Sequence, residues 1–126
     1  MRPRVLVVDW DEGEAHALAA AFAAAGWAAS VRLNSIDGLV AVEDERPMLV
    51  VLRWDMPYID GDTFVRAMAV GLATPPPVLV LAAPAVADAP PRLPLRAAWQ
   101  PVSTPPAAVL RRAQELLGLP THSSSV

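Results

Sequence analysis

The stretch Pro47-Met-Leu-Val-Val-Leu-Arg-Trp-Asp-Met-Pro-Tyr-Ile-Asp-Gly61 decides the fold of this chain. Residues 48 to 52 form a continuous apolar run with β-branched members, which is typical of a strand buried on both faces. The run stops at a polar break that contains Pro57 and Gly61. A strand that ends in such a loop opens onto the carboxyl edge of a parallel sheet, where α/β folds place their sites.

Apolar runs and helical spacings alternate on both sides of this stretch. We predict strands at residues 4–9, 27–33, 48–52, 78–81 and 95–99. We predict helices at residues 12–25, from a cap at Asn34 or Ser35 to an acidic turn at 43–45, from a cap at Asp62 to Gly71, and from a cap at Ser103 or Thr104 to Gly118. This alternation implies right-handed crossovers, so the predicted fold is α/β, a doubly wound five-stranded parallel sheet of flavodoxin-like order 2-1-3-4-5.

The segment after the fourth predicted strand breaks this regularity. Pro84, Pro90, Pro91 and Pro94 fall within eleven residues, and a proline inside a helix costs about 3 kcal/mol. We therefore expect the fourth helix to be short or irregular, with at most one turn around residues 85–89.

Length and composition limit the classes of protein that fit. The chain has 126 residues, of which 54% are hydrophobic, and we predict one domain over residues 1–120. The serine-containing segment 121–126 has little to bury, so we expect a disordered tail or the start of a linker. No apolar run approaches the roughly 20 residues of a membrane span, and no signal peptide is evident.

Charge and cysteine content narrow the partners and the compartment. The net charge of −3 and pI near 5.2 give no overall basic field, so we expect no direct binding of nucleic acid and no membrane association. The absence of cysteine excludes disulfides and fits a cytoplasmic protein. Neither His16 nor His122 has a second ligand at metal spacing, so we predict no metal and no cofactor.

Residues 47–61 resemble the phosphoacceptor segment of bacterial response-regulator receiver domains. In that family an Asp ends the third strand and is followed by x-x-Met-Pro-x-x-Asp-Gly, which Met56, Pro57, Asp60 and Gly61 match. A tryptophan in the position of Trp54 is also found in chemotaxis-type receivers, which the segment resembles. The resemblance extends over residues 4–118, and it implies the same order of elements.

The resemblance also implies a set of site residues. Receivers hold Mg²⁺ with two acids after strand one and place the phosphoacceptor after strand three, a Ser or Thr after strand four, and a Lys before Pro after strand five. In this sequence Asp9 fits the first acid, whereas the other positions differ. The implied degenerate phosphorylation pocket consists of Asp9, Trp10 in place of the second acid, Asp11, Arg53 in place of the acceptor, Asp55, Ala82 in place of the hydroxyl residue, and Gln100 in place of the lysine.

Arginine at position 53 cannot form an acyl phosphate, and a buried guanidinium needs a partner. We predict an ion pair with Asp9 or Asp11, with Asp55 as a third choice. The alternative is that Arg53 turns outward to solvent and the pocket is simply inactive.

Four aromatic residues near the strand ends have two interpretations. Trp10, Trp54 and Tyr58 form a platform for a partner or a small apolar ligand, or they cap the rim of the core. Trp99, near the end of the fifth strand, has the same two interpretations.

The function implied by the resemblance is an atypical, phosphorylation-independent receiver domain that acts as a protein-interaction module in bacterial signal transduction, and not as an enzyme. A protein partner is expected at the face made by the fifth strand and the last helix, with a homodimer as a further option. The alternative is a regulatory domain gated by a small molecule that binds at the former phosphorylation edge.

Overall fold

The computed structural model describes residues 2–120, so the tail predicted at residues 121–126 lies outside the described residues. The strands are Arg4–Val8 (β1), Ala28–Arg32 (β2), Leu49–Arg53 (β3), Val78–Ala82 (β4) and Ala97–Pro101 (β5). The helices are Glu12–Ala24 (α1), Ser35–Glu45 (α2), Gly61–Gly71 (α3), Pro84–Asp88 (α4) and Pro106–Leu117 (α5). Within the described residues, no helix has the length and apolarity needed to cross a bilayer.

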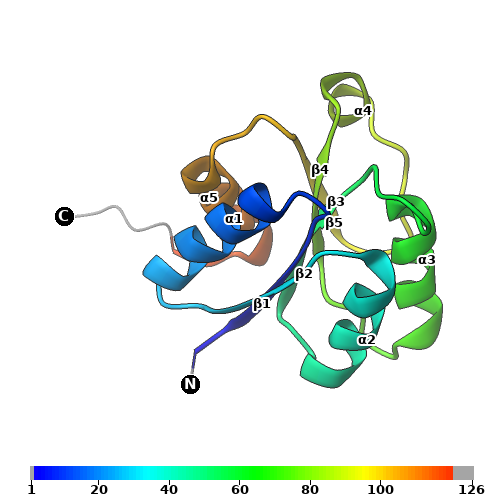
Figure 1. Cartoon of the computed structure of the whole chain (residues 1–126), viewed down its shortest axis with the longest axis horizontal. Helices are drawn as coiled ribbons and strands as arrows, with labels where there is room; N and C mark the ends of the chain where they lie inside the picture. The colour runs from blue at the N-terminus through cyan, green and yellow to red at the C-terminus, as the bar shows by residue number, and fades with distance from the viewer. Residues whose placement is uncertain (1, 121–126) are drawn as a thin grey trace.

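The five strands form one parallel sheet of order β2-β1-β3-β4-β5, which confirms the predicted fold class. Helices α1 and α5 cover one face and α2 and α3 the other, while α4 stands at the carboxyl edge (Figure 1). Strand β1 shows why this sequence needs both layers. Its Val5 and Val7 pack into the cluster under α1 and α5, whereas Leu6 and Val8 pack into the cluster under α2 and α3.

The fourth helix is short, as predicted. Helix α4 has five residues and begins with Pro84, and none of its residues is buried. The chain then runs irregularly to β5, and Leu93 and Leu95 of this loop pack against the core cluster on the α2 and α3 side. Two leucines of a loop thus cover part of the sheet face because the prolines prevent a longer helix there.

Several predicted boundaries are wrong. The acidic residues 43–45 form the last turn of α2 and not a turn after it. Helix α3 is capped by Asp60, whose side chain accepts a hydrogen bond from the Thr63 N–H at 2.9 Å. Asp62 lies inside the helix and pairs with Arg66 at 3.1 Å. Side chains with acceptor groups occur close together here, and the sequence does not show which one faces the free N–H groups.

The last strand and helix also begin later than predicted. Strand β5 covers residues 97–101 and not 95–99, because its register with β4 pairs Ala97 with Val78 and Pro101 with Ala82. Helix α5 has Pro105 at its N-cap, without a side-chain hydrogen bond, in place of the predicted Ser103 or Thr104. The Thr104 hydroxyl instead donates to the side chain of Gln100 at 3.3 Å.

Candidate functional site

The candidate site lies at the carboxyl ends of β1 and β3, which are neighbours in the centre of the sheet. The register pairs Val8 with Leu52, so Asp9 and Arg53 leave adjacent strands at the same level. On the other side of β3, Arg53 pairs with Leu81. The fold therefore gives the arginine an acidic neighbour on one side and an apolar neighbour on the other.

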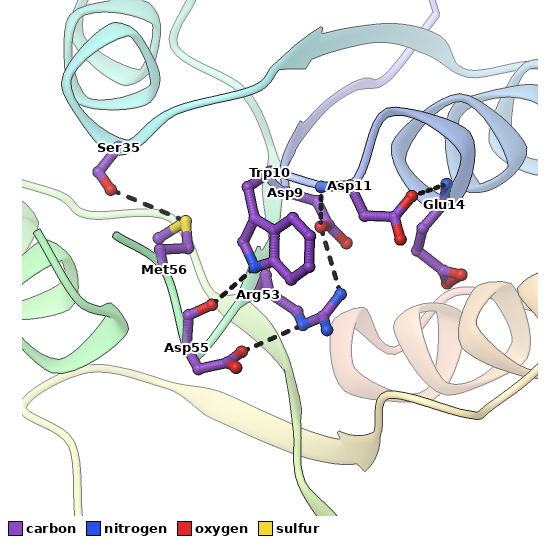
Figure 2. Close-up of polar contacts among 8 residues, drawn as sticks. All are labelled: Asp9, Trp10, Asp11, Glu14, Ser35, Arg53, Asp55 and Met56. Atoms are coloured by element: carbon purple, nitrogen blue, oxygen red, sulfur yellow. Dashed lines mark hydrogen bonds and ion pairs between the residues drawn. The ribbon is translucent and has the colours of Figure 1, made fainter. Parts of the chain in front are cut away.

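Arg53 lies between two carboxylates, as Figure 2 shows. Its Nη1 is 3.4 Å from Asp9 Oδ1, and its Nε is 3.3 Å from Asp55 Oδ1. The guanidinium carbon stands 4.9 Å from the centre of the Trp10 ring, a cation–π distance. With only 15% of its side chain exposed, Arg53 does not turn outward, and the predicted ion pair with Asp9 is confirmed.

Asp9 is almost fully buried, with 1% of its surface exposed. Its Oδ1 accepts the Asp11 N–H at 2.9 Å and faces Arg53, whereas its buried Oδ2 has no hydrogen-bond partner within the described residues. Burial raises the pKa of this carboxyl above its usual value, and the Asp11 N–H and the Arg53 charge offset that rise only in part. The ionised form of Asp9 is therefore costly even beside its arginine partner.

Asp11 does not take the role predicted as an alternative partner of Arg53. Its side chain caps α1 by accepting the Glu14 N–H at 3.1 Å. Glu14, which was not among the predicted site residues, belongs to the same charged group. Partial burial first, and then the charges of Asp9 and Asp11, raise the pKa of Glu14, while Arg53 acts in the opposite direction. The three-residue spacing from the cap to Glu14 was the available signal.

Trp10 is fixed at the rim of this group. Its indole Nε1 donates to the Asp55 carbonyl oxygen at 2.9 Å, and the residue is 45% exposed. Trp10 is thus an aromatic wall beside Arg53, with its outer part in solvent.

The other aromatic residues separate into two groups. Trp54 and Trp99 meet edge to face with ring centres 4.8 Å apart, and both pack against the core cluster under α2 and α3. For these two residues the core-rim interpretation is confirmed. Because Trp54 packs against Trp99 and the core cluster, it does not form a platform with Trp10 and Tyr58. Tyr58 itself is 92% exposed.

Ala82 and Gln100 take part in contacts of their own elements. Ala82 is buried at the end of β4, and its carbonyl accepts the Val102 N–H at 2.8 Å. The Gln100 side chain accepts the Thr104 hydroxyl at 3.3 Å. Neither of these contacts links them to the group around Arg53.

The loop from β3 to α3 has a tightly determined shape. A Cβ on Gly61 would lie 2.5 to 2.9 Å from ring and backbone atoms of Trp54, so only glycine fits without a shift. The buried Ser35 hydroxyl donates to the Ile59 carbonyl at 2.6 Å and ties this loop to the start of α2. The sequence suggested Ser35 only as one of two candidate N-caps of this helix, and Asn34 is the residue that caps it.

Comparisons with known proteins agree with this fold. No family model matches the chain, and no curated protein matches it. Among solved structures, the chain is similar to the chemotaxis response regulator CheY4 of Vibrio cholerae, with 18% identity over 92% of this chain and 99% of that one and a TM-score of 0.77. It is also similar to the receiver domain of Francisella response regulator 1452 (19%, 93% and 98%, TM-score 0.75) and to that of the hybrid histidine kinase CckA (19%, 90% and 98%, TM-score 0.75). At these identities the likeness establishes that the chain has the receiver fold.

Proposed function

We propose that this protein is a phosphorylation-independent receiver-like module of bacterial signal transduction, which acts through protein contacts and not as an enzyme. The observation that carries the proposal is Arg53, which ends β3 where the receiver resemblance implies the phosphoacceptor. An arginine in this position forms no acyl phosphate, and its charge is already matched by Asp9 and Asp55 at 3.4 and 3.3 Å.

The side chains at this edge do not fit the Mg²⁺ that the receiver resemblance implies. Magnesium requires several oxygen ligands in a regular octahedron. Here the guanidinium of Arg53 stands against Asp9 Oδ1, and Trp10 takes the place of the second acid. Within residues 2–120, no three His, Asp or Glu side chains converge in a way that suits a metal ion.

A permanent cation at this position supports a constitutive state. In the proposed module, Arg53 supplies without a metal the positive charge that Mg²⁺ supplies in the receivers that the chain resembles. The pair with Asp9 holds the ends of β1 and β3 in one arrangement. Its signalling output then depends on its concentration and on which partners it binds, and not on phosphorylation.

The same feature favours this function over a domain gated by a small molecule. An anionic ligand at the former phosphorylation edge would need a cation that is free to receive it. Arg53 is engaged on both sides and 15% exposed.

We place the contact with the partner on β5 and α5, where a protein partner or a second copy of the chain would bind. We also propose that the protein acts in the cytoplasm.

Phosphorylation is tested directly by incubating the protein with acetyl phosphate and Mg²⁺ and measuring the intact mass. We expect no added phosphoryl group, and none after Arg53→Asp, because Ala82 and Gln100 supply neither hydroxyl nor amine. A stable phosphoryl group that maps to Asp9 or Asp55 in the unmodified chain would overturn the proposal.

A second experiment separates the two functions. Affinity capture from the source organism and a thermal-shift screen of small metabolites are run on the same protein. We expect a protein partner that is lost when exposed residues of α5 such as Arg111 are replaced. A metabolite that raises the melting temperature only while Arg53 is intact would support the gated domain instead.

A further inference from the structure

Tyr58 lies in a strained turn, and packing of its side chain does not explain the strain. The Ile59 N–H donates to the Pro57 carbonyl at 2.9 Å, which closes a three-residue turn around Tyr58 at φ 69°. The γ-turn with a positive central φ is the rare and strained form, and glycine or asparagine adopts such a φ more readily than tyrosine. Because the side chain is 92% exposed, burial gives no compensation for this strain.

The backbone on both sides of Tyr58 is held in place. The Ser35 hydroxyl binds the Ile59 carbonyl at 2.6 Å, and the Gly61 N–H donates to the Trp54 carbonyl at 2.8 Å. Met56 is buried in the core cluster. The loop therefore presents an exposed tyrosine on a rigid support, which lowers the entropy cost of binding a partner.

Two hollows adjoin this loop. One, of about 410 Å³, is lined by Trp10, Asp55, Met56, Pro57 and Asp60. The other, of about 310 Å³, is lined by residues 34–37 and Tyr58. The first has the fixed indole of Trp10 as a wall, which Figure 2 shows beside Asp55, and the second includes Ile36, an aliphatic side chain that is 57% exposed.

The charges around the two hollows are negative. Asp55 and Asp60 line the first hollow and Asp37 lines the second, and all three are exposed. Hydrogen bonds from Thr63 lower the pKa of Asp60, so this carboxylate stays ionised at neutral pH. Arg53 is mostly buried and pairs with Asp9 and with Oδ1 of Asp55, so part of the Asp55 charge is already matched.

We propose that the surface formed by Trp10, Ile36, Asp55, Tyr58 and Asp60 binds a basic segment of a partner protein. An arginine or lysine of that segment lies against the exposed part of the Trp10 ring, with Asp60 and Oδ2 of Asp55 as its acceptors, since Oδ1 of Asp55 pairs with Arg53. An aliphatic side chain of the segment packs on Tyr58 and Ile36. This inference rests on the proposed function, since it names the partner chemistry of a module that works by protein contact. It adds a surface distinct from the one on β5 and α5.

The test measures binding of a capped synthetic peptide of alternating leucine and arginine by titration calorimetry. Its control peptide carries neutral citrulline in place of each arginine. We expect saturable binding of the arginine peptide, much weaker binding of the citrulline peptide, and a loss of affinity as salt rises. No saturable binding, or equal binding of both peptides, would overturn the inference, whereas the proposed function is judged separately by the phosphoryl assay.

Tyr58→Gly is the informative variant, because glycine accepts the positive φ and removes an exposed side chain. We expect about tenfold weaker binding of the arginine peptide with an unchanged or higher melting temperature. Binding equal to that of the parent chain contradicts the inference. Weaker binding with a lower melting temperature also contradicts it, because Tyr58 would then act by stabilising the fold.

One matched pair of variants and one control for Tyr58→Gly test whether binding depends on this surface or on general charge and hydrophobicity. Asp60→Ser removes a carboxylate but keeps a capping oxygen on α3, and Asp44→Ser makes the same charge change on an exposed position of α2. We expect roughly threefold weaker peptide binding for Asp60→Ser and no change in binding for Asp44→Ser. Val70→Ala, on another highly exposed apolar residue, should also leave binding unchanged, and equal effects within either comparison would refute the surface.

Discussion

The part of the chain up to α3 and the part from β4 onward begin their helices in different ways. Helices α1, α2 and α3 each have a capping side chain, from Asp11, Asn34 and Asp60, that accepts a backbone N–H three residues later at 2.8 to 3.1 Å. Helices α4 and α5 have Ala83 and Pro105 as their N-cap residues, and neither makes such a side-chain bond. Of the 14 prolines, 11 lie after residue 74.

This difference shows how two halves of one sheet reach order by different means. In the first part, side-chain hydrogen bonds determine where helices begin. In the second part, proline restricts the unfolded chain and leucines of a loop cover the core. The charged group around Arg53 comes wholly from the first part. The candidate site therefore lies in the part of the chain where side-chain caps define the helix starts.

The largest expected effect comes from Gly61→Ala in the first part. The new Cβ would lie 2.5 Å from the Trp54 ring and 2.8 Å from its carbonyl oxygen, and backbone atoms yield less readily than a flexible side chain. We expect a loss of about 1 to 3 kcal/mol in the free energy of unfolding, measured by urea denaturation.

Gly71→Ala, at the last residue of the same helix, is the matched control. Its Cβ would have no heavy atom within 4 Å, and its φ is not in the left-handed region. Alanine should therefore stabilise the protein by about 0.4 to 1 kcal/mol. Equal and small effects at both glycines would show that the β3–α3 loop adapts and is not tightly determined.

The second prediction concerns the coupling between Asp9 and Arg53. Alanine at either position leaves the other charge without its partner, so the two single losses should exceed what the double variant shows. We expect a coupling free energy of about 0.5 to 3 kcal/mol from the double-mutant cycle. The exposed pair Asp62 and Arg66, at 3.1 Å, should give only about 0.3 to 0.5 kcal/mol. A coupling free energy for Asp9 and Arg53 no greater than that for Asp62 and Arg66 would remove the physical basis of the proposed constitutive state.

The third prediction follows from the raised pKa of Asp9, whose main cause is burial. A carboxyl with a raised folded pKa favours the fold while it is protonated, and this contribution is lost as the pH rises through that pKa. Asp9→Asn should therefore show a smaller loss of stability than the parent chain as the pH rises from the acid range towards neutrality. Thermal melts across that range test this. Parallel pH profiles for the two proteins would contradict it.

These comparisons also show what the sequence could predict. Strand order, the short α4 and the pairing of Arg53 with Asp9 follow from residue type and from the strand ends they flank, and the structure confirms them. Apolar runs and prolines act locally, so a single sequence carries their consequences.

The parts that the sequence did not predict depend on side-chain direction. Which of Asp60 and Asp62 caps α3, and whether Trp54 joins Trp10 or Trp99, are decided by contacts between distant elements. The late start of β5 has the same origin, since pairing with β4 sets its register. The strained φ of Tyr58 has no signal in a segment that reads as an ordinary turn.

The last prediction tests whether capping alone separates the two parts. Asp60→Ala removes the N-cap of α3 and should cost about 1 kcal/mol, because the Thr63 N–H loses its acceptor at 2.9 Å. Ala83→Asp supplies a cap to α4 at an exposed position with extended ψ. Its gain should be smaller, at most a few tenths of a kcal/mol, because α4 spans five residues and the prolines beyond it prevent growth of the helix. Urea denaturation measures both changes, and hydrogen exchange at the Ala87 amide, which bonds the Ala83 carbonyl at 2.9 Å, reports α4 itself. A gain at Ala83 as large as the loss at Asp60 would mean that missing caps, and not proline, make the second part irregular.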